Sequence, residues 1–181
     1  MEYRIKSILM DGAAMERALR RIAHEIIERN GGTDGLLLVG IERRGVPLAC
    51  RLQEMIFQVE GRKVPLGSLD ITRYRDDLSR LSEDAVVRET QMPDGVEGAR
   101  IVMVDDVIYS GRTARAAMVA LCDSGRPACI QLACLIDRGH RELPIRPDYV
   151  GKNVPTSKSE LVSVLVPEFD GQMRVELLEQ M

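Results

Sequence analysis

The 181-residue sequence contains no tryptophan, and aromatic residues make up only 3% of it. So few aromatics argue against an aromatic stacking platform for single-stranded nucleic acid. The longest apolar run covers residues 35–41, far short of the roughly 20 residues that cross a bilayer. Residues 1–10 include Glu2, Arg4 and Lys6, where a signal peptide needs an apolar stretch. We therefore expect a cytoplasmic protein without membrane contact.

Signatures of several common sites are also missing. The chain has neither the G-x-x-x-x-G-K-[ST] loop nor the G-x-G-x-x-G turn, which argues against a Walker-type or dinucleotide-binding fold. Its cysteines lie in apolar segments without C-x-x-C spacing, which predicts buried, reduced thiols rather than a metal site or disulfides. They are Cys50, Cys122, Cys129 and Cys134. The net charge is −3, so nucleic-acid binding would require a local basic patch.

The residues that are present have the pattern of one α/β domain. Hydrophobic residues make up 45% and charged residues 29%, as in ordinary globular proteins. Continuous apolar runs, typical of buried parallel strands, alternate with segments of helical spacing. Strands are predicted at 36–41, 64–71, 101–104 and 129–136, helices at 13–30, 46–56 and 112–124, and a closing antiparallel pair at 161–166 and 173–178. This order favours a doubly wound sheet, whose ligands bind beyond the carboxyl ends of the strands.

One of those strand ends carries the strongest chemical signal. The predicted strand 101–104 ends in Asp105 and Asp106, and a turn of small residues then opens a helix near Arg112. Free amides at a helix N-terminus, with the Ser110 and Thr113 hydroxyls, suit a phosphate. The paired carboxylates suit vicinal sugar hydroxyls or a hydrated Mg²⁺. The plainer interpretation is that the acidic pair merely ends a strand and the small residues merely turn the chain.

This segment resembles the ribose-phosphate signature of type I phosphoribosyltransferases. Five further blocks, at residues 21–25, 39–41, 70–78, 137–146 and 151–160, look like those of the pyrimidine-operon attenuation regulators, the PyrR family. The resemblance implies the type I phosphoribosyltransferase fold, a mostly parallel twisted sheet flanked by helices with a small hood. Residues 1–181 would form one such domain, with the hood built mainly from about 138–160 and the terminal segments.

The resemblance also implies roles for particular residues. Asp105 and Asp106 would take the ribose hydroxyls, and Arg43 and Arg44 would act with them in catalysis. The site for phosphoribosyl pyrophosphate (PRPP) and nucleotide would comprise Val104, Asp105, Asp106, Val107, Ile108, Tyr109, Ser110, Gly111, Arg112 and Thr113. The pyrophosphate loop would be Glu42, Arg43, Arg44 and Gly45, with a cis peptide at 42–43 or 43–44. Arg73 and Arg75 would belong to a lid at 72–84, and Ile136, Asp137 and Arg138 would approach uracil. Mg²⁺ would enter with PRPP and would have no direct protein ligand.

The implied activities are uracil phosphoribosyltransfer, giving UMP and pyrophosphate, and uridine-nucleotide-dependent binding to pyrimidine-operon leader mRNA. The nucleotides are UMP and UTP, and a homodimer or larger homo-oligomer is expected. Basic residues of the first helix and of the hood would contact RNA phosphates. They are Arg17, Arg21, His24, His140, Arg141, Arg146 and Lys152. Alternatively, His24 and His140 are ordinary surface histidines that do not contact RNA.

Other readings stay open at this point. The chain could be a salvage uracil phosphoribosyltransferase that binds no RNA, or a nucleotide-sensing RNA-binding protein with a vestigial active site. The basic face of the first helix argues against a salvage enzyme that binds no RNA. The intact segment 105–113 argues against a vestigial active site. A purine phosphoribosyltransferase is a further possibility, but the hood sequence gives it no support.

Overall fold

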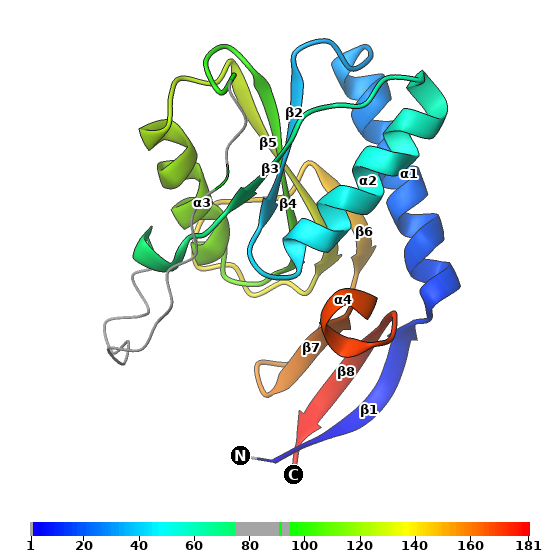
Figure 1. The fold of residues 1–181 in the computed structure, drawn as a ribbon. Coiled ribbons are helices and arrows are strands. Elements are labelled where there is room, and N and C mark those ends of the chain that lie inside the picture. Colours follow the sequence, from blue (N-terminus) through cyan, green and yellow to red (C-terminus); the bar gives the residue numbers. More distant parts are fainter. Residues whose placement is uncertain (1, 75–90, 92–94) are drawn as a thin grey trace.

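The computed structural model describes residues 2–74, 91 and 95–181 of the chain. Its centre is a parallel five-stranded sheet in the order β3-β2-β4-β5-β6 (Figure 1). The strands are β2 (Leu36–Ile41), β3 (Leu66–Leu69), β4 (Arg100–Ile108), β5 (Cys129–Asp137) and β6 (Tyr149–Asn153). Every residue of β2 is buried, as a strand covered on both faces requires. The predicted parallel sheet is confirmed.

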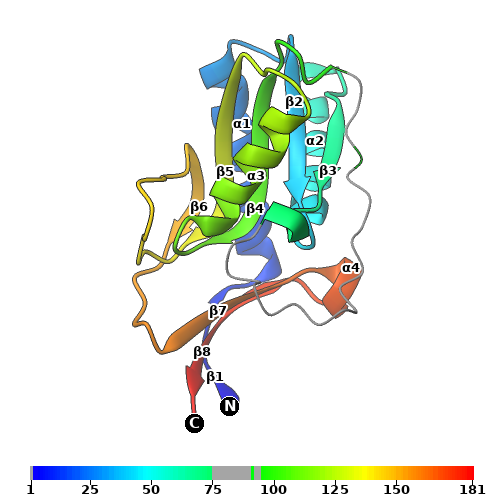
Figure 2. The ribbon, with the colours of Figure 1, turned by 90° about the vertical axis from the view of Figure 1, so that its left-hand side faces the viewer.

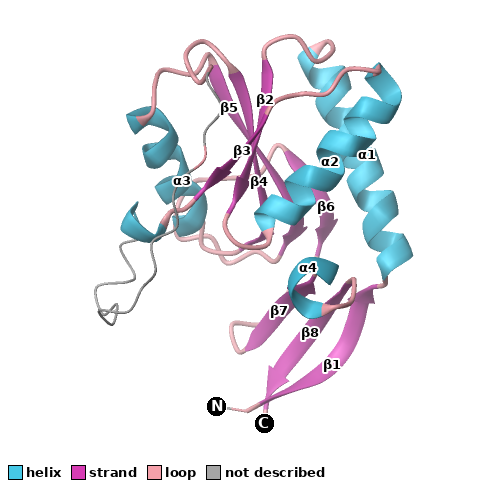
Figure 3. Cartoon of the chain, in the orientation of Figure 1, coloured by secondary structure: helices cyan, strands magenta, loops and turns pink. Residues whose placement is uncertain are grey.

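Helices cover both faces of this sheet. α1 (Gly12–Asn30) and α2 (Gly45–Glu60) lie on one face and α3 (Arg112–Asp123) on the other (Figures 1 and 3). α1 buries Met15, Leu19, Ile22 and Ile26, whose spacing of three and four residues places them on one side of a helix. The Asp11 carboxylate caps α1 by accepting the Ala14 N–H at 2.7 Å. The predicted helix positions are confirmed to within a few residues.

A second, smaller sheet lies beneath the carboxyl ends of the central strands (Figure 2). It contains β1 (Tyr3–Met10), β8 (Arg174–Gln180) and β7 (Glu160–Leu165) in that order, all antiparallel. The short helix α4 (Pro167–Asp170) connects β7 to β8, and the single turn η1 (Thr72–Tyr74) follows β3. This hood therefore consists of the two terminal segments of the chain. Residues 149–153, which the sequence placed in the hood, pair with β5 in the central sheet instead.

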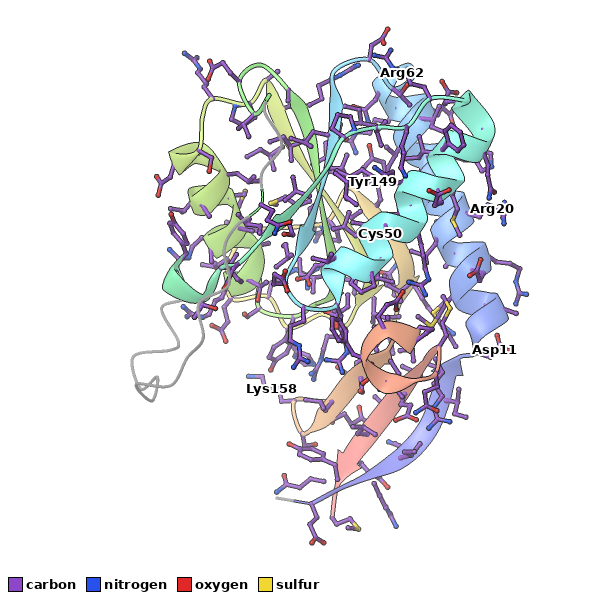
Figure 4. All side chains as sticks on the ribbon, in the orientation of Figure 1. Asp11, Arg20, Cys50, Arg62, Tyr149 and Lys158 are labelled. Carbon is purple, nitrogen blue, oxygen red and sulfur yellow. The ribbon has the colours of Figure 1, made fainter. Side chains whose placement is uncertain are left out.

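Two other expectations need correction. β4 does not end before the acidic pair: its pairing with β5 continues through Asp105 to Ile108, because carboxylate side chains leave the main-chain bonds of a strand intact. The prediction of buried thiols holds for Cys134 alone, since Cys50, Cys122 and Cys129 are exposed. Cys50 lies on α2 (Figure 4) and Cys122 on α3, and each is on the solvent-exposed side of its helix. Within the described residues, no helix combines the length and apolar character needed to cross a membrane.

Candidate active site

A cavity of about 330 Å³ opens where β4 turns into α3. Its lining includes every residue of 104–113 except Val104 and Asp106, and also Leu132 and Cys134 of β5. The first turn of a helix leaves backbone N–H groups without intrahelical partners. Gly111 begins this turn at a φ of 94°, a conformation that other residues rarely adopt. The cavity therefore has the donors that a phosphate group requires.

The acidic pair lies on the last part of β4. Asp105 Oδ1 accepts the Asp106 N–H at 2.9 Å, and Asp106 Oδ1 accepts the Val107 N–H at 2.8 Å. Burial raises the pKa of the Asp106 carboxyl, although the Val107 N–H and the positive charge of Arg44 oppose the rise. These local hydrogen bonds fix the orientation of both carboxylates beside the cavity. Such a pair is suited to accept hydrogen bonds from vicinal sugar hydroxyls.

The loop between β2 and α2 packs directly against the acidic pair. A Cβ atom on Gly45 would lie 2.2 Å from the Val104 carbonyl oxygen, so only glycine permits this approach. The peptide bond between Glu42 and Arg43 is cis, at one of the two predicted positions. The structure therefore brings together two segments about sixty residues apart in sequence, the proposed pyrophosphate loop and the acidic pair.

The two arginines of this loop contact α4. Arg44 Nη2 donates to Asp170 Oδ1 at 2.9 Å. The Arg43 guanidinium carbon lies 5.0 Å from the centre of the Phe169 ring, a cation–π distance. Neither Phe169 nor Asp170 was among the predicted site residues. They follow the loop by more than 120 residues, so local sequence carries no signal for these contacts.

The segment after β5 closes over the other side of the cavity. Arg141 Nη1 donates to the Tyr109 carbonyl oxygen at 2.9 Å, and the Glu142 N–H donates to that of Ser110 at 2.9 Å. The Glu142 carboxylate also pairs with Arg112 Nε at 2.7 Å. Glu142 lines the cavity and was not predicted. The predicted RNA contact Arg141 is therefore engaged with the rim of the cavity.

The residues predicted to approach uracil occupy the end of β5. Ile136 is fully buried, and the Asp137 carboxylate pairs with Arg141 at 2.6 Å. Arg138 is also buried, and its guanidinium donates to the Ser157 and Glu160 carbonyl oxygens. The same guanidinium lies 4.2 Å from the centre of the Tyr109 ring. The Arg138 side chain thus packs against Tyr109 of the cavity wall, which leaves the neighbouring main chain as the predicted contact for a base.

The predicted RNA contacts on α1 lie beside β6. Arg21 donates to the carbonyl oxygens of Val150 at 3.0 Å and Gly151 at 2.7 Å, and Lys152 donates to that of Leu9 at 3.0 Å. Arg17 and His24 are exposed on the same side of α1, and Figure 4 shows Arg20 extending outward from it. The structure therefore joins α1 to β6, which carries Lys152, another of the predicted RNA contacts.

The other predicted RNA contacts lie between β5 and β6, and two further predicted site residues belong to the proposed lid. Arg146 is exposed, whereas His140 is half-buried with Nε2 2.5 Å from the Thr156 carbonyl oxygen. Arg73 falls in η1, and its side chain lies outside the described part of the chain. Arg75 and the rest of the predicted lid beyond residue 74 also lie outside the described residues.

Comparisons with known proteins agree with this geometry. The phosphoribosyl transferase domain family matches residues 6–167. A solved hypoxanthine phosphoribosyltransferase of Trypanosoma cruzi superposes with a TM-score of 0.74 at 17% identity, over 98% of each chain. A hypoxanthine-guanine phosphoribosyltransferase of Bacillus anthracis gives a TM-score of 0.70 at 14% identity, over 99% of this chain and 100% of that one. These similarities show that the chain has the phosphoribosyltransferase fold.

Closer relatives share most of the sequence. "Bifunctional protein PyrR" of Pelotomaculum thermopropionicum is 62% identical over 97% of both chains. The protein of the same name from Thermus thermophilus is 60% identical over 98% of both. The chain therefore belongs to the phosphoribosyl transferase family and, within it, to the PyrR proteins.

Proposed function

We propose that this protein transfers the phosphoribosyl group of PRPP to uracil and, with a uridine nucleotide bound, binds the leader mRNA of a pyrimidine operon to control its transcription. Full-length identity of about 60% to bifunctional PyrR proteins carries this proposal. The phosphate cavity, the acidic pair and the arginine loop at one edge of the sheet support the enzymatic half. The basic residues of α1 and β6 support the RNA-binding half.

The transfer breaks the anomeric C–O bond and develops positive charge on the ribose as pyrophosphate leaves. In the proposed arrangement, residues 107–113 hold the 5′-phosphate, and Asp105 and Asp106 hold the ribose hydroxyls. Arg43 and Arg44 neutralise the charge that grows on the departing pyrophosphate. The main chain of residues 136–138 orients uracil for attack at the anomeric carbon. Catalysis then depends on positioning and electrostatics, without a covalent enzyme intermediate.

Mg²⁺ fits this chemistry as an ion that binds together with PRPP. Protein sites for this ion commonly supply one or two carboxylates, while substrate phosphates and water supply the other ligands. Asp105 and Asp106 beside the cavity would hold the hydrated ion through its water ligands, so Mg²⁺ needs no direct protein ligand. When bound, Mg²⁺ would withdraw charge from the pyrophosphate leaving group.

The proposal is tested by replacing both Asp105 and Asp106 with asparagine, which preserves shape and removes two charges. We expect uracil phosphoribosyltransferase activity to fall by at least about a hundredfold, since charge-assisted contacts at a reacting centre contribute several kcal/mol. Circular dichroism and thermal unfolding report whether the variant is folded. Undiminished activity in a folded double variant would contradict the assignment of the acidic pair.

The RNA-binding half needs its own measurement. Gel shifts of the wild-type protein with the pyrimidine-operon leader of its own organism, with and without UMP, should show tighter binding when UMP is present. An unrelated RNA of equal length and charge is the control, because backbone contacts alone give sequence-independent binding. Equal binding to both RNAs under all conditions would leave a salvage enzyme that does not regulate transcription.

A further inference from the structure

We propose that α4 of the hood positions the pyrophosphate-binding arginines, with Asp170 holding Arg44 and Phe169 holding Arg43. Here "positioning" means that neither α4 residue touches the substrate and that both act through the arginines. The inference rests on the proposed assignment of residues 42–45 to the pyrophosphate of PRPP. It extends that assignment from the loop to α4 of the hood.

The contacts of α4 are directed at one stretch of the chain. Glu168 pairs with Arg51 at 2.7 Å, Phe169 lies 5.0 Å from the Arg43 guanidinium, and Asp170 pairs with Arg44 at 2.9 Å. Three successive residues of α4 thus each meet an arginine from the beginning of α2 or the loop before it. Figures 1 and 2 both show α4 next to this end of α2.

Asp170 is itself held in place. Its Oδ2 atom accepts the Val166 N–H at 2.9 Å, while Oδ1 accepts from Arg44. Burial opposes ionisation of this carboxyl, but the Val166 N–H and Arg44 outweigh it, so the pKa of Asp170 lies below its ordinary value. A carboxylate fixed by a backbone N–H of the same short helix segment is a firm anchor for a long arginine side chain.

Arg44 interacts both with α4 and with the acidic pair. Only its Nη2 atom contacts Asp170. Arg44 Nε is buried and has no hydrogen-bond partner among the described residues. The guanidinium also acts on Asp106, whose pKa it lowers against the effect of burial. Arg44 therefore lies between the hood and the acidic pair, where a pyrophosphate group would meet it.

Anchoring should make binding of the pyrophosphate group tighter, because the side chain is already ordered before the ligand arrives. Ordering one long side chain on binding costs about 0.5–1.5 kcal/mol, which corresponds to about a two- to twelvefold change in affinity. UMP has no pyrophosphate group, so its affinity should not depend on α4. This difference between ligands separates positioning from a general effect on folding.

The test compares calorimetric affinities of the full-length wild type and its variants for PRPP, pyrophosphate and UMP, each in the presence of Mg²⁺. Asp170→Ala should weaken PRPP and pyrophosphate binding by about three- to tenfold and leave UMP binding unchanged. Phe169→Leu keeps an apolar side chain but removes the aromatic face, and about a two- to fivefold weakening is expected. The matched control is Glu168→Ala, which removes the neighbouring pair with Arg51 and should alter none of the three affinities.

A double-variant comparison shows whether Asp170 acts through Arg44. In the Arg44→Ala background, Asp170→Ala should cause no further loss of pyrophosphate affinity. The inference is overturned if Asp170→Ala binds pyrophosphate as well as or better than the wild type, or if UMP affinity falls in parallel. Phe169→Leu gives an independent answer if Asp170→Ala fails to fold, because Phe169 is 41% exposed and contributes little to the core. A wild type that binds neither PRPP nor pyrophosphate would instead contradict the proposed function itself.

Discussion

Cys134 forms part of the wall of the cavity between β4 and α3 and lies opposite Asp105 in the register of β4 and β5. Burial raises the pKa of its thiol well above the ordinary value, and the nearby carboxylates of Asp105 and Asp106 raise it further. The thiolate is the reactive form of cysteine. Cys134 is therefore an inert, compact side chain that fills the space behind the acidic pair.

Thiol labelling of the native protein tests this description. At pH 8 we expect Cys50, Cys122 and Cys129 to react with a thiol reagent, because they are exposed, and Cys134 to react only after denaturation. The measurement is the number of labelled thiols per chain by mass spectrometry, with Cys134→Ala as the control that never gains a fourth label. Rapid labelling of Cys134 in the native state would show that the cavity wall opens.

At the scale of whole elements, the helices and buried strands could be predicted because their apolar spacing is local information. Leu36–Ile41 and the apolar face of α1 are examples, and the structure places both as expected. The extent of β4 could not be predicted, because Asp105 and Asp106 are polar although their main chain continues the strand. The pair between Arg44 and Asp170 joins residues 126 positions apart, so only the folded chain reveals it.

The contact between α1 and β6 gives a prediction that separates RNA binding from folding. Arg17 is exposed, whereas Arg21 donates to two carbonyl oxygens of β6. Arg17→Ala should weaken RNA binding and reduce the slope of log K against log salt by up to about 0.7–0.9, without a change in stability. Arg21→Ala should weaken RNA binding and also lower the free energy of unfolding by about 1 kcal/mol.

Salt-dependent RNA titrations and urea unfolding measure these two effects. Arg62→Ala is the matched control, since it removes one surface arginine at the far end of α2 (Figure 4) and changes the net charge equally. If Arg17→Ala and Arg62→Ala have the same effect on RNA binding, α1 is not part of the RNA interface and the basic side chains there only keep the helix solvated.

At the scale of the whole molecule, one continuous segment connects the cavity between β4 and α3 to the basic residues of α1 and β6. Residues 141–143 donate hydrogen bonds to the carbonyl oxygens of Tyr109 and Ser110, and β6 follows a few residues later with two of its carbonyl oxygens held by Arg21. We expect a nucleotide that orders the cavity rim to affect β6 and α1 through this hydrogen-bonded segment. This arrangement gives the proposed dependence of RNA binding on uridine nucleotides a physical route.

The coupling between UMP binding and RNA binding can be measured with either ligand, because thermodynamic linkage makes it reciprocal. If UMP tightens RNA binding by a certain factor, bound RNA must tighten UMP binding by the same factor, and such factors typically lie at about 5- to 150-fold. Calorimetry of UMP with and without RNA, and of RNA with and without UMP, gives the two values.

Glu142→Gln removes the charge that pairs with Arg112 at the rim, so we expect it to reduce both factors together while RNA affinity without nucleotide stays at the wild-type value. Unequal factors in the wild type would mean that the two ligands do not share one equilibrium. Unchanged factors in Glu142→Gln would mean that the rim does not carry the coupling.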